Sequence, residues 1–405
     1  MALFDFLKRR RPEDAFAERL MARLRERGWP HEVSYDPGRF ALITSPRGDV
    51  LHLDAIYRDW ATYPRTEQAA QLDRAIAPVL EADLVQGFDE AAPRLLPVVR
   101  NLADLQGLAL DADTASLEIG QPYRRLGGPL AILLAVDLPH SIALIPRDKL
   151  EEWGRPFEEL LTRAVDNLVA LSAVRFEEAP GGFHISGYGD GYDSSRLLLP
   201  ELFHALQLKG DPVAVAVTRD SVVVAGSDDI PALTAMANYV VEAFRDATRP
   251  MSYQPLRLRG DRWEPLTAEL TSQVYGLGEL AVRQAIWDYG LQTPRLERLF
   301  QQQAIDVFIP PLQVVGAEGE AFTWTSWTES ATDFLPKSDG VGMTSASGQT
   351  LFRQWTDIET VCGPFTEDVA YHPPRYRTPV WPDARGLARL EHEFTTPDWW
   401  VRARR

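Results

Sequence analysis

The residues whose types and spacing best suit chemistry lie in the stretch GYGDGYDSSRLLLP at 187–200. Three glycines at alternate positions surround the carboxylate of Asp190, and Asp193 and Arg196 follow. Carboxylate oxygens and loop carbonyls are the ligands that Mg²⁺ and Ca²⁺ prefer. One hypothesis is therefore a metal-assisted hydrolase that uses Asp190, Asp193 and Arg196.

The same stretch has two other interpretations. Glycines before a helix can hold a phosphate on backbone N–H groups, but Asp190 and Asp193 would repel an anion. The third interpretation is structural and is favoured, because helix-starting turns are far commoner than sites. It predicts that Asp193 caps a helix by accepting the N–H of Ser195 or Arg196, and that Arg196 pairs with Asp190.

Elsewhere the chain lacks established signatures of chemistry. It has no HExxH, GxSxG, Walker, CxxC or EF-hand pattern. Its seven histidines are scattered, whereas a metal site needs convergent ligands. The catalytic residues and the cofactor stay unknown, and no metal ligand is assigned.

Composition limits the classes of partner. The 405 residues are 45% hydrophobic and carry a net charge of −16, which argues against nucleic acid as a partner because phosphate contacts need clustered Lys and Arg. No apolar run is long enough for a transmembrane segment. The first 27 residues hold eight Lys or Arg against five Asp or Glu, so residues 1–11 can touch an anionic membrane weakly.

The start of the chain also bears on its location. It has no long apolar region and no small-residue cleavage site of the kind that secretory signals carry. The lone Cys362 has no partner for an intramolecular disulfide. Together these features predict a cytoplasmic protein.

The elements that must position the loop are strands and amphipathic helices. Apolar spacing predicts a helix over 13–27, and Asp36-Pro37-Gly38 predicts a hairpin between two of three strands. Residues 134–150 and 215–230 resemble each other and predict two β-β-α units, each a hairpin followed by a helix, in one sheet. Such units favour the α+β class, an antiparallel sheet with helices on one face.

The composition changes near residue 268. Eight of the eleven Trp lie in residues 251–405, and a helix over roughly 276–304 precedes short strands. We expect three parts: a basic arm and helix at 1–28, an α+β domain at 29–268, and a smaller Trp-rich α+β domain at 269–405. A protease is expected to cut between the last two, at 266–276.

Some of these residues carry a resemblance. LLPVVR at 95–100, LAVDLPHSIALI at 134–145 and above all GDGYDSSRLLLP at 189–200 resemble the bacterial YtpQ-like family of unknown function, over roughly residues 10–268. The resemblance implies a bacterial cytoplasmic protein but no reaction, and residues 269–405 lie outside it. Pro200 departs from the family, whose helix is expected to continue there.

The sequence thus favours a non-catalytic binding or adaptor module. Its partner would be another protein, bound through exposed Trp side chains, or a small ligand held between the domains. The alternatives are the metal-assisted hydrolase at the 187–200 loop and a peripheral membrane factor that uses residues 1–11.

Overall fold

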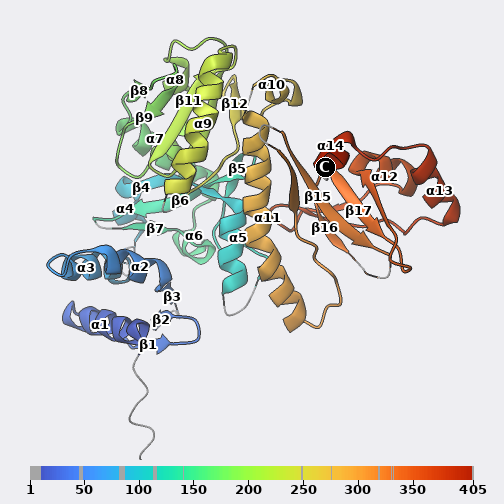
Figure 1. Ribbon diagram of the computed structural model, residues 1–405. Helices are drawn as coiled ribbons and strands as arrows, with labels where there is room; N and C mark the ends of the chain where they lie inside the picture. The colour runs from blue at the N-terminus through green and yellow to red at the C-terminus, as the bar shows by residue number, and fades with distance from the viewer. Residues whose placement is uncertain are drawn as a thin grey trace, which may run out of the picture. The chain divides into compact units, whose positions relative to one another are not determined.

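The computed structural model describes residues 11–44, 49–81, 87–112, 116–139, 141–247, 250–274, 276–317, 320–329, 331 and 333–403. They form helices and several antiparallel sheets, which confirms the predicted α+β class (Figure 1). The chain divides into two compact units. Unit 1 holds Met1–Leu96 and Ala135–Ile145, and unit 2 holds Pro97–Leu134 and Pro146–Arg405. The domain boundaries expected after residues 28 and 268 remain predictions.

Unit 1 packs a helix against a small sheet. Helix α1 (Pro12–Glu26) buries Phe16, Leu20 and Leu24, as the apolar spacing predicts. The Asp36 carboxylate accepts the N–H of Gly38 at 2.8 Å, and the predicted hairpin forms at this turn. Residues 1–10 of the proposed membrane arm lie outside the described part of the chain. The elements are β1 (Val33–Asp36), β2 (Ala41–Thr44), β3 (Asp49–His52), α2 (Asp54–Thr62), α3 (Gln68–Glu81), α4 (Phe88–Ala91) and the 3₁₀ turn η3 (Ala92–Arg94).

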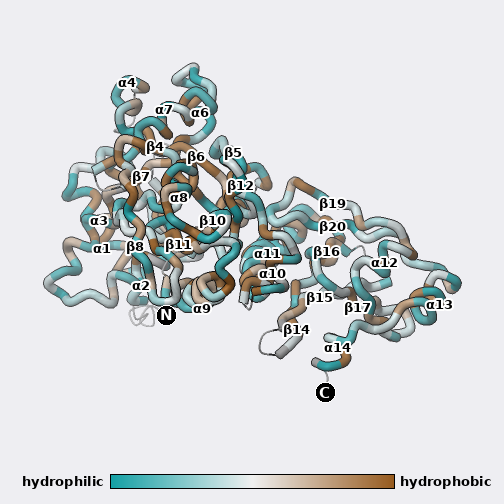
Figure 2. The backbone as a smooth tube through the Cα atoms, turned by 90° about the horizontal axis from the view of Figure 1, so that it is seen from above, coloured by the Kyte–Doolittle hydropathy of each residue, from teal (hydrophilic) through white to brown (hydrophobic). Residues whose placement is uncertain are grey.

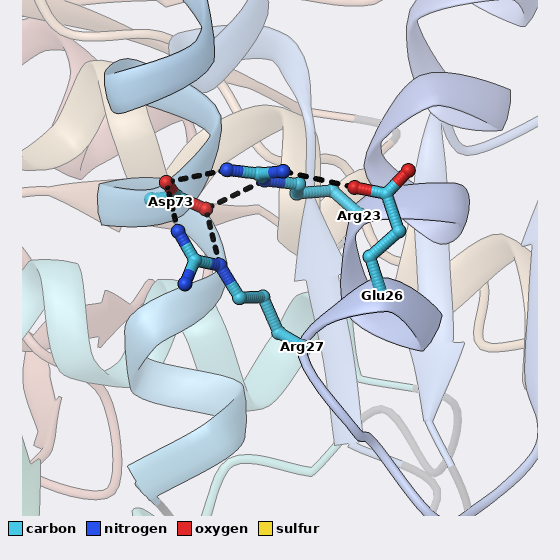
Figure 3. Close-up of polar contacts among 4 residues, drawn as sticks. All are labelled: Arg23, Glu26, Arg27 and Asp73. Atoms are coloured by element: carbon cyan, nitrogen blue, oxygen red, sulfur yellow. Dashed lines mark hydrogen bonds and ion pairs between the residues drawn. The ribbon is translucent and has the colours of Figure 1, made fainter.

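Asp73 of α3 links this helix to α1 (Figure 3). Its carboxylate accepts from Arg23 Nε at 2.7 Å and from Arg27 Nη2 at 2.6 Å, while Arg23 also donates to Glu26 at 2.8 Å. The hydrogen bonds from Arg23 and then Arg27 hold the pKa of Asp73 well below its usual range. The cluster therefore ties two helices together through a carboxylate that stays ionised.

A six-stranded antiparallel sheet forms the centre of unit 2 and is covered by α9 (Ile230–Asp246). Asp229 caps α9 by accepting the N–H of Ala232, and Leu233, Met236 and Val240 pack against the sheet. The helix predicted to follow the second of the two similar hairpins is thus confirmed. In spatial order the strands are β13 (Arg262–Pro265), β12 (Leu256–Arg259), β10 (Pro212–Thr218), β11 (Ser221–Gly226), β9 (His184–Ser186) and β8 (Phe176–Glu178).

The two predicted hairpins form, but not in a common sheet. Strand β6 (Leu130–Asp137), an almost continuous hydrophobic stretch in Figure 2, pairs antiparallel with β7 (Ile142–Leu144). Helices α6 (Arg147–Trp153) and α7 (Phe157–Ala170) follow, as α9 follows β10 and β11. The expectation of one sheet is wrong: β6 and β7 belong to a separate four-stranded sheet, while β12 and β9 occupy the two free edges of the β10–β11 hairpin.

The C-terminal part of unit 2 contains two smaller sheets. One has the order β14 (Gln313–Ala317), β15 (Glu320–Thr328), β17 (Gly340–Thr344), β18 (Thr350–Gln354), and its β15–β17 pair is parallel. The other has the order β16 (Phe334–Pro336), β20 (Arg375–Arg377), β19 (Thr366–Asp368). Helices α12 (Trp355–Cys362), α13 (Ala384–His392) and α14 (Asp398–Ala403) accompany them.

The Trp side chains of this region are largely core. Trp327 meets Trp381 and Trp324 meets Trp400, so the two residues of β15 face different neighbours, as their odd spacing predicts. None of the eight Trp in residues 251–405 is in the exposed class; three are buried and five are half-buried. The Trp set therefore stabilises the fold and does not form an exposed patch.

Helices α5 (Leu102–Asp111) and α11 (Leu277–Gln302) lie side by side (Figure 1). Arg295 and Arg298 of α11 both donate to Asp111 at the end of α5. Helix α11 follows the short α10 (Ala268–Gln273) and confirms the helix expected at 276–304. Throughout the described part of the chain, no helix is both long enough and apolar enough to cross a bilayer.

Candidate functional site

Arg196 lies at the centre of the predicted loop site and is fully buried. Its Nη1 and Nη2 donate to Asp190 Oδ1 and Oδ2 at 2.9 and 2.6 Å, and its Nε donates to Ser172 Oγ at 2.9 Å. The guanidinium also stacks on Tyr188, 3.6 Å from the ring centroid. The predicted pairing of Arg196 with Asp190 is confirmed.

Asp190 is engaged on both oxygens. Besides Arg196, the N–H of Tyr192 donates to Asp190 Oδ1 at 3.0 Å. Burial alone would raise the pKa of Asp190, but the hydrogen bonds from Arg196 and Tyr192 outweigh it and lower the pKa. The carboxylate thus stays ionised and is committed to an internal ion pair.

Asp193 does not cap a helix. It precedes the 3₁₀ turn η4 (Ser194–Leu198), and its side chain makes no cap hydrogen bond. The reason is its own helical backbone, with φ −53° and ψ −49°, whereas a capping residue needs an extended conformation to turn its oxygen toward the free N–H groups. The predicted cap is therefore wrong. The short helix α8 (Pro200–His204) then begins at Pro200.

The Asp193 carboxylate is instead buried against the loop. Its Oδ1 accepts the N–H of Tyr188 at 3.2 Å, and its Oδ2 has no hydrogen-bond partner among the described residues. Burial raises the pKa of Asp193. Asp190 and Asp193 thus have different roles. Asp190 forms an ion pair, and Asp193 accepts a hydrogen bond from the loop backbone. Within the described residues no three His, Cys, Asp or Glu side chains gather to hold a metal ion.

A second group of polar side chains converges where α5 and α11 meet residues 369–375. Two adjacent pockets lie there, of about 270 and 850 Å³. We call the smaller one the Asp288 pocket and the larger one the Arg147 pocket, after a residue that lines each. They share Arg125, His372 and Pro374 in their walls.

Strand β5 (Arg124–Gly127) positions Arg125. Because side chains alternate along a strand, Arg124 turns to Glu158 at 3.1 Å while Arg125 reaches His372. Gly127 lets β5 approach its neighbour, since a Cβ there would lie 2.8 Å from the carbonyl oxygen of Trp263. The local sequence therefore aims one of two consecutive arginines at the pockets.

His372 is held as a neutral ring. Arg125 Nη2 donates to Nδ1 at 3.3 Å, and Nε2 lies 3.2 Å from the hydroxyl of Tyr123. Since a guanidinium can only donate, Nδ1 is the acceptor, and the proton of the neutral ring lies on Nε2. Burial, with the charge of Arg125, lowers the pKa of His372 to about 4.

The segment that carries His372 is fixed by side chains of α5 and α11. Gln106 accepts the N–H of His372 and donates to the carbonyl of Ala370, both at 2.8 Å. Gln292 and Tyr289 donate to the carbonyls of Pro373 and Pro374 at 2.7 and 2.8 Å. These hydrogen bonds preorganise the ring in its place.

Asp288 lines its pocket and is almost fully buried. Its Oδ1 accepts from Asn101 Nδ2 at 3.0 Å and from Gln284 Nε2 at 2.8 Å. Burial raises the pKa of Asp288 to about 7, against the effect of these two hydrogen bonds, and the charge of Asp104 adds to the rise. A carboxyl group that changes protonation near neutral pH thus faces a pocket, an arrangement typical of functional sites.

The pocket combines this carboxyl with apolar walls. The walls include Leu102, Ala103, Pro129, Ala281, Ala285 and Pro373, and the polar groups besides Asp288 are Arg125, Gln254, Gln284, Tyr289 and His372. Apolar walls with a few convergent polar groups are the usual makeup of small-molecule sites. The arrangement can bind and orient a small polar molecule.

The sequence did not point to these residues, although one signal was present. Gln284, Asp288 and Gln292 recur every four residues along α11, and all three are buried. From sequence alone, a polar stripe of this kind predicts a solvated helix face, because its partners are not known. His372 is one of seven scattered histidines and carries no local signal.

Comparison with known proteins identifies one relative at the level of sequence. The chain is 23% identical over 266 residues to the UPF0354 protein ABC2771 of Shouchella clausii (strain KSM-K16), a match that covers 62% of this chain and 94% of the relative. No family model matches the chain, and no solved structure matches it. The chain is thus distantly similar to a member of a family of unknown function, while its resemblance to the YtpQ-like family remains a prediction.

Proposed function

We propose that the protein is a non-catalytic binding protein that holds a small polar ligand in the Asp288 pocket. The observation that carries this proposal is a pocket that Asp288 lines together with Arg125 and His372, and whose walls come from both sides of residue 268. Residues 102–129 and 254 supply one side, and α11 with residues 372–374 supplies the other. This matches the expectation of a ligand held between the two predicted domains.

The other classes have less support. The hydrolase needs Asp190 as a metal ligand, but both of its oxygens already accept from Arg196. The protein-binding adaptor needs exposed Trp side chains, and none of the eight in residues 251–405 is exposed. Of the arm proposed for a membrane factor, only Arg11 is described, and α1 behind it packs within unit 1.

A screen by thermal unfolding tests the proposal. A ligand that binds the native state raises the melting temperature according to its concentration and Kd. The screen would use a library of small polar metabolites at millimolar concentration, and each hit would be repeated on two variants. Ala285→Leu fills part of the pocket, whereas Ile286→Leu changes an exposed neighbour on the same helix and serves as the control.

The expected result is at least one compound that raises the melting temperature of the wild type and of Ile286→Leu but not of Ala285→Leu. The proposal fails if no compound stabilises the wild type. It also fails if every hit stabilises Ala285→Leu equally, because those ligands would then bind elsewhere.

A further inference from the structure

The two amide groups that donate to Asp288 are oriented by the hydrogen bonds that their oxygens accept. The amide oxygen of Asn101 accepts the N–H of Ala103 at 2.7 Å. The amide oxygen of Gln284 accepts from Ser252 Oγ at 2.9 Å and from the N–H groups of Tyr253 and Gln254. With their oxygens committed to donors, both amides must turn their NH₂ groups toward Asp288.

These hydrogen bonds leave a negatively charged group facing the pocket. Both amides donate to Oδ1 of Asp288, so that Oδ2 is the oxygen left for a ligand. A buried carboxylate is stabilised most by a positive charge that hydrogen-bonds to it. A protonated amine is such a group, and it would complete the set of partners around Asp288.

The opposite charge on the same pocket belongs to Arg125. The other ionisable groups that line the pocket, Tyr289 and His372, are neutral at pH 7, because burial raises the pKa of the first and lowers that of the second. In the adjoining Arg147 pocket, two arginines face two glutamates, Glu118 and Glu367. Of these two adjacent pockets, the Asp288 pocket therefore sets one carboxylate against one guanidinium.

We propose that the ligand of the Asp288 pocket is a small zwitterion of the amino-acid class, with its ammonium group on Asp288 and its carboxylate on Arg125. This inference rests on the proposed function and names the class of ligand. Each end of such a molecule meets its opposite charge, whereas an anion would meet Asp288 and a cation would meet Arg125.

The volume of the Asp288 pocket suits a ligand of monomer size. A volume of about 270 Å³ corresponds to about nine water molecules. Alanine, leucine and proline side chains line the remaining wall, so the carbon skeleton between or beside the charges is apolar.

Calorimetric titration at pH 8 with a graded series of probes tests the proposal. The probes are the linear ω-amino acids from glycine to 6-aminohexanoate together with L-leucine, which vary the separation of the charges. Butyrate and butylamine match 4-aminobutyrate but carry one charge each. The variants are Asp288→Asn, which keeps the shape and loses the charge, Arg125→Ala, and Arg124→Ala as the control on the opposite face of β5.

At least one zwitterion is expected to bind the wild type and Arg124→Ala equally, and to bind Asp288→Asn and Arg125→Ala at least tenfold more weakly. Butyrate and butylamine are expected to bind at least tenfold more weakly than the best zwitterion. The unfolding transition of each variant confirms that it is folded.

The zwitterion is refuted if no probe binds the wild type, if a singly charged probe binds as tightly, or if Asp288→Asn leaves the affinity unchanged. These failures are distinct from failure of the proposed function. A library hit that Ala285→Leu blocks but that carries no charge, or one charge only, would keep the binding function and reject the zwitterion. The absence of any hit that Ala285→Leu blocks would reject both.

Discussion

At the scale of single residues, the partners of the buried carboxyl groups distinguish a structural role from a possible role in ligand binding. Asp190 has an arginine on both oxygens and a lowered pKa. Asp193 and Asp288 are buried without a basic partner in hydrogen-bond contact, and both have raised pKa values. Of the three, Asp288 lines the pocket of about 270 Å³.

Asp193 gives the first prediction. Asp193→Ala leaves the buried N–H of Tyr188 without its acceptor and should lower the free energy of unfolding by about 1–3 kcal/mol. Asp193→Asn keeps an oxygen acceptor and should cost less. Chemical unfolding at pH 7 measures both. If Asp193→Asn lowers the free energy of unfolding as much as Asp193→Ala does, the negative charge itself matters, and the loop is again a candidate site.

Asp288 predicts a dependence of stability on pH. Its pKa in the folded protein is raised to about 7, so the folded state binds the proton more tightly than the unfolded state. Its contribution to stability is therefore full below pH 4, falls as pH rises toward 7, and is lost above that value. The loss is at most about 4 kcal/mol, from 1.4 kcal/mol for each pKa unit.

Asp288→Asn removes this dependence and is the matched variant. Without ligand, the difference in unfolding free energy between Asp288→Asn and the wild type should move in favour of the variant between pH 5 and 8. Burial lowers the pKa of His372 to about 4 and raises that of Tyr289, so neither group titrates in this range. Burial raises the pKa of Asp104 to about 6, and its charge is coupled to that of Asp288, so the comparison reports the titration of this pair. A constant difference over this range would mean that Asp288 titrates with an ordinary pKa.

At the scale of elements, local patterns predicted helices and hairpins but not their partners. The apolar spacing of α9 and the Asp36 turn are local, and both predictions are confirmed. Placing β12 beside β10 and β9 beside β11 depends on pairing between distant segments, and the expectation of one shared sheet was therefore wrong. The Asp288 pocket could not be predicted for the same reason, since β5, α5, α11 and residues 372–374 meet only in the folded chain.

The element-scale prediction concerns the attachment of residues 370–372 to α5. Gln106→Leu keeps the size of the side chain but removes the acceptor of the His372 N–H and the donor to Ala370. The change should lower the free energy of unfolding by about 1–3 kcal/mol and speed hydrogen exchange at the His372 amide. Gln301→Leu, at an exposed position of α11, is the control. Unchanged exchange at His372 would show that other bonds hold the segment.

At the scale of the whole molecule, residues on both sides of the predicted boundary at 268 belong to unit 2. Gln284 accepts from Ser252 and from the N–H groups of Tyr253 and Gln254, and Leu277 and Leu280 join the core of the six-stranded sheet. We therefore expect a protease cut within 266–276 to leave two pieces that elute together in native gel filtration and separate in urea. Separation in native buffer would show that the two parts need no mutual packing.

The proposed binding function depends on where a small ligand binds. The most direct measurement is a crystal structure of the wild-type protein with the tightest ligand from the screen. We expect ligand density in the Asp288 pocket, with contacts to Asp288 and Arg125. Density at the 187–200 loop instead, with the Asp288 pocket holding only water, would contradict it.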